Sequence, residues 1–145
     1  MKTLKALTAV LLIIFSVSAF ADENNKNAKS KMEATVVTYV DAMKNGKVKD
    51  LSALFDQDLK YTISRGDVIL NYNKTELLAE LKNHENIIQN CDTDYSIIES
   101  NPVQSIVKVN LKYESFTKVN FVTLSNTSKG WKITNISSSY STSYQ

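Results

Sequence analysis

The sequence contains few of the residues that constrain a chain covalently or break its regular elements. Its 145 residues include one cysteine, one proline, three glycines and one histidine. A single cysteine excludes an intramolecular disulfide and a structural zinc site made of several cysteines. The chain must therefore rest on its hydrophobic core, and we predict no metal, no cofactor and no catalytic constellation.

Long apolar runs are also missing, except at the N-terminus. Residues 1–21 hold two lysines near the start, then an apolar run, and end in Ala19-Phe20-Ala21. This order is typical of a secretory signal peptide, and the apolar run is short for a membrane span. We therefore expect cleavage after Ala21, a secreted or periplasmic protein, and no membrane attachment after cleavage.

The chain also lacks a strong excess of one charge. It has 17 Lys+Arg and 15 Asp+Glu; its first 21 residues carry two lysines and no acid, so the remaining 124 residues carry 15 of each. The signs are interspersed, whereas a nucleic-acid-binding protein shows a clustered basic face. We therefore expect no nucleic-acid partner, and one domain with a single core.

The first part of the mature chain is predicted to be helical. Residues 22–29 are polar without periodicity and are predicted to form a flexible arm. A capping box that begins at Ser30 predicts a helix start, and Gly46 suits a left-handed cap at the helix end. A short helix follows, up to Phe55. The apolar stripe of the first helix comprises Met32, Val36, Tyr39, Val40 and Met43.

From Asp58 onward the hydrophobic period is mostly that of strands. A hairpin is predicted around the turn at 65–67, followed by a helix capped by Asn73. The inner side of that helix is predicted to hold Leu77, Leu78, Leu81, His84 and Ile88. The predicted strands are 58–64, 68–73, 95–100, 105–113, 118–124 and 131–136, and residues 141–145 are predicted to be frayed.

This order predicts an α+β fold: helix, helix, strand, strand, helix, then four strands. A curved, mainly antiparallel sheet is expected to wrap on the long N-terminal helix over residues 30–140 and to form a cone. Such a cone leaves a hollow suited to a small molecule.

The segment between the first helix and the first strand resembles the nuclear transport factor 2-like family, also called the cystatin-like α+β cone. That family often shows a helix, a glycine turn, a short helix ending in Leu-Phe, and an aspartate before a strand. The matching residues are Asn45, Gly46, Leu51, Leu54, Phe55 and Asp58, and Trp131-Lys132-Ile133 resembles the family's penultimate segment.

Within that family, the first helix is similar to that of bacterial ketosteroid isomerases, where a tyrosine acts in the oxyanion hole. The resemblance places Tyr39 at that tyrosine and Asn120 near the second oxyanion group. It places Ile63 where the isomerases have a catalytic aspartate, and isoleucine cannot abstract a proton. The resemblance thus implies a pocket that binds a ligand without converting it. The predicted ligand-binding residues are Tyr39, Phe55, Tyr61, Ile63, Asn120 and Val122.

Three functions remain open. The first is an exported, non-catalytic protein that binds a small apolar or aromatic molecule. The second is an interaction module, with a homodimer through the outer sheet face, because both faces of the last strands hold apolar residues. The third is an isomerase or dehydratase with a relocated acid as base. For three candidate residues, a purely structural role is the alternative to a functional one. Tyr39 would then be a core tyrosine, His84 a partly buried side chain and Cys91 an unreactive cysteine.

Overall fold

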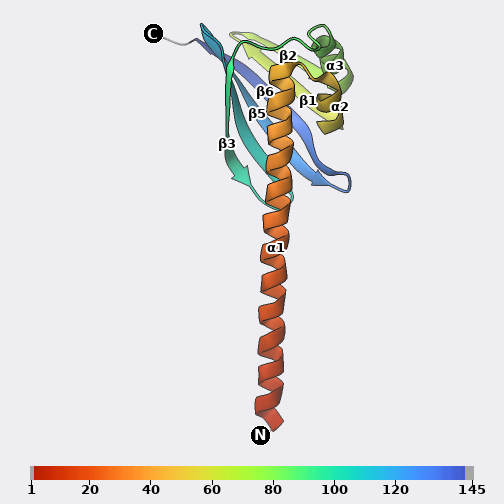
Figure 1. Cartoon of the computed structure of the whole chain (residues 1–145), viewed down its shortest axis with the longest axis vertical. Coiled ribbons are helices and arrows are strands. Elements are labelled where there is room, and N and C mark those ends of the chain that lie inside the picture. Colours follow the sequence, from red (N-terminus) through yellow and green to blue (C-terminus); the bar gives the residue numbers. More distant parts are fainter. Residues whose placement is uncertain (1, 143–145) are drawn as a thin grey trace.

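The computed structural model describes residues 2–142, with side chains from residue 22 onward. Its elements are α1 (Lys2–Asn45), α2 (Val48–Leu54), β1 (Phe55–Arg65), β2 (Val68–Asn73), α3 (Lys74–Lys82), β3 (Asp92–Ser100), β4 (Gln104–Lys112), β5 (Phe116–Thr127) and β6 (Gly130–Thr142). The strands form one sheet in the order β2-β1-β6-β5-β4-β3. All neighbours are antiparallel except β1 and β6. The predicted α+β cone is confirmed, and Figure 1 shows the sheet beside the C-terminal half of α1.

The first helix differs from its predicted extent. α1 is continuous from Lys2 to Asn45, so residues 22–29 are helical and Ser30 starts no helix. The physical reason is that no glycine or proline lies in this span, while its many Lys and Ala residues favour a helix. The indole N–H of Trp131 donates to the carbonyl of Ala28 at 3.0 Å, which ties this part of α1 to β6. The signal peptide and its cleavage site stay predictions.

The core lies between α1 and the inner face of the sheet. In the predicted stripe, Met32, Val36 and Tyr39 are at most 2% exposed, and Val40 and Met43 are half-buried against the core. Ala42, which was not predicted, is also fully buried. Strands β1, β4, β5 and β6 alternate as predicted, with inner residues buried and their neighbours more exposed, whereas β2 and β3 hold no buried residue. The buried strand residues include Leu59, Tyr61, Ile63, Val107, Val109, Leu111, Val122, Leu124, Ile133 and Ile136.

The outer sheet face carries apolar residues as well. Phe121 is 42% exposed, and Ile106 and Val119 are half-buried. All three alternate with buried neighbours, so they point away from α1. The homodimer predicted from this face stays a prediction. Among the described residues, no helix combines the length and the apolar character that a membrane span requires.

α1 ends at a left-handed glycine that also anchors the segment after α3. Gly46 has φ +65°, as the sequence predicts for a helix cap. Its carbonyl accepts from the amide of Asn86 at 2.9 Å, and the carbonyl of Lys44 accepts from the amide of Gln89 at 2.7 Å. The segment 83–89 is thereby fastened against the end of α1.

The third helix is shorter than predicted. Its capping box at Asn73 and Glu76 is confirmed, but α3 ends at Lys82, so the prediction that His84 and Ile88 share its inner side is wrong. The reason is that the amides of Asn86 and Gln89 bond to carbonyls at the end of α1, and that Asn86 adopts φ +62°. His84 is exposed, and Ile88 is 70% exposed. The predicted fraying covers residues 141–145: 141 and 142 belong to β6, and 143–145 lie outside the described residues.

Replacing Gly46 by alanine tests the anchor. A Cβ at this position would lie 2.8 Å from the carbonyl oxygen of His84 and 2.9 Å from the amide nitrogen of Asn86. We expect Gly46→Ala to lower the free energy of unfolding by about 3 kcal/mol, because left-handed strain and overlap with backbone add. The measurement is urea unfolding followed by circular dichroism.

Gly66→Ala is the matched control, because Gly66 also has a positive φ, +57°, but nothing within 4 Å of its added Cβ. Gly66→Ala should lower the free energy of unfolding by only about 1 kcal/mol, which is the cost of the left-handed backbone strain alone. Equal losses in the two variants would show that the close approach at Gly46 has no energetic weight.

Candidate functional site

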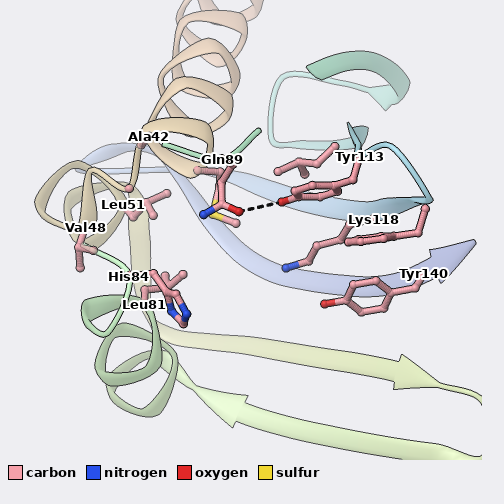
Figure 2. A pocket seen from close by; sticks show the side chains of 13 residues that line it. Ala42, Val48, Leu51, Leu81, His84, Gln89, Tyr113, Lys118 and Tyr140 are labelled. Carbon is pink, nitrogen blue, oxygen red and sulfur yellow. Dashed lines mark hydrogen bonds between the residues drawn. The ribbon is translucent and has the colours of Figure 1, made fainter. Parts of the chain in front are cut away.

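Two adjoining cavities lie between the end of α1, α3 and the inner face of the sheet. Their volumes are about 280 and 310 Å³. Both are lined by Leu81, His84, Lys118 and Tyr140. Figure 2 shows that Lys118 and Tyr140 extend their polar ends into the same space, towards His84. We call the two together the paired cavity.

The paired cavity exists because the strands continue past the end of α1. Leu111, Lys118 and Tyr140 are direct cross-strand neighbours on β4, β5 and β6. All three line the first cavity together with Ala42 near the end of α1 and Gly46 just beyond it. The helix stops here, so it covers this row of the sheet only in part. The segment 83–89 and α3 cover the other side.

The first cavity is mainly apolar and aromatic. Its rings are Tyr113 and Phe116, stacked with centroids 4.6 Å apart, and Tyr140. The hydroxyl of Tyr113 donates to the side-chain oxygen of Gln89 at 3.1 Å (Figure 2). Burial is the main cause that raises the pKa of Tyr113 to about 12, so this hydroxyl stays protonated at neutral pH. The remaining lining residues are Met43, Val48 and Leu51.

The second cavity holds more polar groups. The rings of Tyr61 and Tyr72 lie 5.9 Å apart in its wall. Arg65 donates to the hydroxyl of Tyr140 at 3.3 Å, and its guanidinium lies 5.0 Å from the centre of that ring. This bond is the main cause that raises the pKa of Arg65 above its usual value. Ile63, Leu70, Leu77 and Glu80 complete the lining. Among the described side chains, no group of three or more His, Cys, Asp or Glu is placed to hold a metal ion.

Tyr39 and Asn120, the two predicted hydrogen-bonding residues, contact each other in the core rather than in either cavity. The amide of Asn120 donates to the hydroxyl of Tyr39 at 3.2 Å, and the hydroxyl of Ser138 donates to the side-chain oxygen of Asn120 at 2.5 Å. All three residues are about 1% exposed. Burial strongly raises the pKa of Tyr39, which keeps its hydroxyl neutral. We call these three residues the polar triplet.

The remaining predicted site residues divide between cavity and core. Tyr61 and Ile63 line the second cavity, whereas Phe55 and Val122, like the polar triplet, line neither cavity. The alternative candidate His84 lines both cavities. Cys91, 8% exposed, borders a separate surface depression beside Lys112 and Asp92.

The sequence analysis missed Lys118 and Tyr140. Lys118 stands two residues before Asn120, so period-two alternation places it on the same inner face. Tyr140 likewise follows Ser138 by two residues, and β6 continues to Thr142 rather than ending near Ile136. Following the alternation one step back from Asn120, and two steps beyond Ile136, could have found both residues.

The polar triplet should stabilise the fold in a pH-dependent way. We expect Tyr39→Phe to lower the free energy of unfolding by about 1–2 kcal/mol at pH 7, because the buried amide of Asn120 loses its partner. Tyr39 ionises near pH 10 only in the unfolded state, so its contribution is present below pH 10 and is lost above it, by about 1.4 kcal/mol per unit. The gap between wild type and variant should therefore close near pH 11. Urea unfolding at pH 7, 10 and 11 measures this.

Tyr95→Phe serves as the control, because Tyr95 is 39% exposed and lies outside the triplet. It should change stability little at any of these pH values. A gap for Tyr39→Phe that widens with pH would contradict the assignment.

Comparison with known proteins places the chain in a family. The family model described as "Putative lumazine-binding" matches residues 27–139. Solved structures share the fold: a nuclear transport factor 2-like protein of unknown function from Silicibacter pomeroyi is 18% identical, with 81% of this chain and 97% of that chain covered and a TM-score of 0.63. No curated protein matches the sequence.

Two further structures extend this comparison. A cystatin-like fold protein from Burkholderia xenovorans is 14% identical, with 79% and 92% of the two chains covered and a TM-score of 0.65. A "putative ketosteroid isomerase" from Kribbella flavida is 14% identical, with 80% and 82% covered and a TM-score of 0.51. At such identities these structures show the fold alone. The family match spans most of the chain, and the protein therefore belongs to the family described as "Putative lumazine-binding", with the nuclear transport factor 2-like cone as its fold.

Proposed function

We propose that this is an exported protein that binds a small, planar aromatic or apolar molecule in the paired cavity and does not transform it. The observation that carries the proposal is the paired cavity itself, two hollows of about 280 and 310 Å³ that share four lining residues. An apolar and aromatic wall with a few converging polar groups is the usual form of a small-molecule site.

The family description supports an aromatic ligand. It names lumazine, a flat bicyclic heteroaromatic molecule. The first cavity offers the stacked rings of Tyr113 and Phe116, and the second offers Tyr61 and Tyr72. Flat aromatic faces favour ligands that can stack on them in an offset or tilted arrangement.

Two features favour binding without chemistry. Ile63 lies in the wall of the second cavity, at the position where the resemblance to isomerases places the proton-abstracting aspartate. Tyr39 and Asn120, which the resemblance would aim at a ligand, instead bond to each other in the core. The walls therefore offer no aspartate at that position and no oxyanion pair.

A second candidate function is catalysis with a relocated base. His84 and Glu80 both line the second cavity, and either group can accept a proton. This candidate requires that a bound ligand is converted. Mass spectrometry of the ligand after prolonged incubation separates the two candidates, and loss of any conversion in His84→Asn or Glu80→Gln would assign the base.

Filling the paired cavity should abolish binding. We expect Leu81→Trp to weaken the binding of lumazine, or of the neutral fluorescent probe N-phenyl-1-naphthylamine, at least tenfold, because Leu81 borders both cavities. Fluorescence titration and thermal shift measure this. Leu78→Trp is the control, since Leu78 is also half-buried on α3 but faces a different depression. If wild type binds neither compound, or if both variants bind as well as wild type, the proposal fails.

Export makes its own prediction. The mature protein recovered from the culture medium or periplasm of a bacterial host should begin at Asp22, because cleavage is expected after Ala21. Intact mass and N-terminal sequencing measure this. Ala19→Arg together with Ala21→Arg should block processing, whereas Ala28→Arg, beyond the site, should not. An unprocessed protein in the cytoplasm would contradict export.

A further inference from the structure

We propose that the paired cavity selects ligands whose aromatic body carries an anionic group, and that this group binds between Lys118 and Arg65 beside the hydroxyl of Tyr140. The inference rests on the proposed binding function and adds the charge of the ligand. Its support comes from the position of the two cations, their surroundings and the charge balance of the walls.

Lys118 projects into the cavity rather than to the outer surface. It lies on the inner face of β5, between Leu111 and Tyr140 in the cross-strand row, and it lines both cavities. Its amino group lies 5.8 Å from the centre of the Tyr61 ring and 5.9 Å from that of Tyr140. Figure 2 shows this amino group in the open space of the cavity.

Arg65 approaches the same tyrosine from the other side. Its guanidinium lies 5.0 Å from the centre of the Tyr140 ring and donates one bond to the Tyr140 hydroxyl. A guanidinium has five N–H donors, so four remain for other acceptors. Tyr140 thus has a cation against it from each of two strands, and its hydroxyl can donate to an anion that both cations attract.

Among the described side chains, neither Lys118 nor Arg65 forms an ion pair with a carboxylate. The ion pairs between described side chains are Lys26–Asp22, Lys47–Asp41 and Lys112–Asp94, and none involves Lys118 or Arg65. Among the described residues that line the paired cavity, Glu80 is the one acid. The same lining holds the two cations Lys118 and Arg65, together with His84. The net charge of the walls therefore favours an anion.

A cationic ligand fits less well, although tyrosines line the site. Aromatic rings can hold an ammonium ion within about 6 Å of their centres. Here the protein's own cations already occupy that range over Tyr61 and Tyr140. A second cation would meet repulsion from both. A carboxylate, sulfonate or phosphate would instead gain charge-assisted hydrogen bonds.

A matched pair of probes tests the inference. 8-Anilinonaphthalene-1-sulfonate and N-phenyl-1-naphthylamine share one aromatic skeleton, and only the first carries a sulfonate. We expect Lys118→Met to weaken the binding of the sulfonate probe about tenfold and that of the neutral probe less than twofold. Arg65→Gln should weaken the sulfonate probe severalfold, and Lys118→Arg should restore most of its affinity. Raising salt from 50 to 500 mM should weaken only the sulfonate probe.

Two control variants test where the probes bind and whether the loss of affinity comes from the charge of Lys118. Lys108→Met makes the same change on the outer face of β4, opposite Phe121, and should affect neither probe. Leu81→Trp should abolish the binding of both probes, which places them in the paired cavity. If wild type binds neither probe, the proposed function fails. If wild type binds both, but Lys118→Met weakens the two equally or not at all, the anion inference alone is overturned.

Discussion

The end of α1 at Gly46 is the constraint on which the paired cavity depends. β6 runs alongside α1 and continues to Thr142, whereas the helix stops at Asn45. A longer helix would cover the row of Leu111, Lys118 and Tyr140 and would turn it into core. The left-handed glycine stops the helix, and its carbonyl bonds to Asn86. One residue thus both opens the hollow and fixes the segment that covers it.

Two adjacent rows of the inner face consequently serve different purposes. The row of Val109, Asn120 and Ser138 lies under α1, and every buried polar side-chain atom among the described residues is bonded within the protein. The next row lies beyond α1, and there Lys118 keeps its amino group in the cavity. Successive inner residues of a strand are about 7 Å apart. On β4, β5 and β6, core packing and the proposed ligand contact are therefore separated by one step along the strand, whereas on β1 both Tyr61 and Ile63 reach the second cavity.

The sequence allowed the fold to be predicted better than the site. Alternation in the strands and the stripe of α1 identify the core, because burial imposes a period on the sequence. The resemblance placed Tyr39 and Asn120, 81 residues apart, beside a ligand, whereas in the structure they bond to each other in the core. The position of the cavity was not anticipated, because it depends on where α1 ends relative to β6. That offset is set by packing between distant segments, and no local pattern in the sequence records it.

The identity of residue 118 is difficult to explain by stability alone. Lys118 forms no ion pair with a carboxylate among the described side chains, and its contacts with two tyrosine rings are worth only about 1 kcal/mol each. An apolar residue at the same inner position would extend the packing that Asn120, Val122 and Leu124 continue along β5. Natural proteins often sacrifice stability where a site requires it. The proposed anionic ligand therefore explains the charge in the paired cavity better than stability does, because the fold gains little from it.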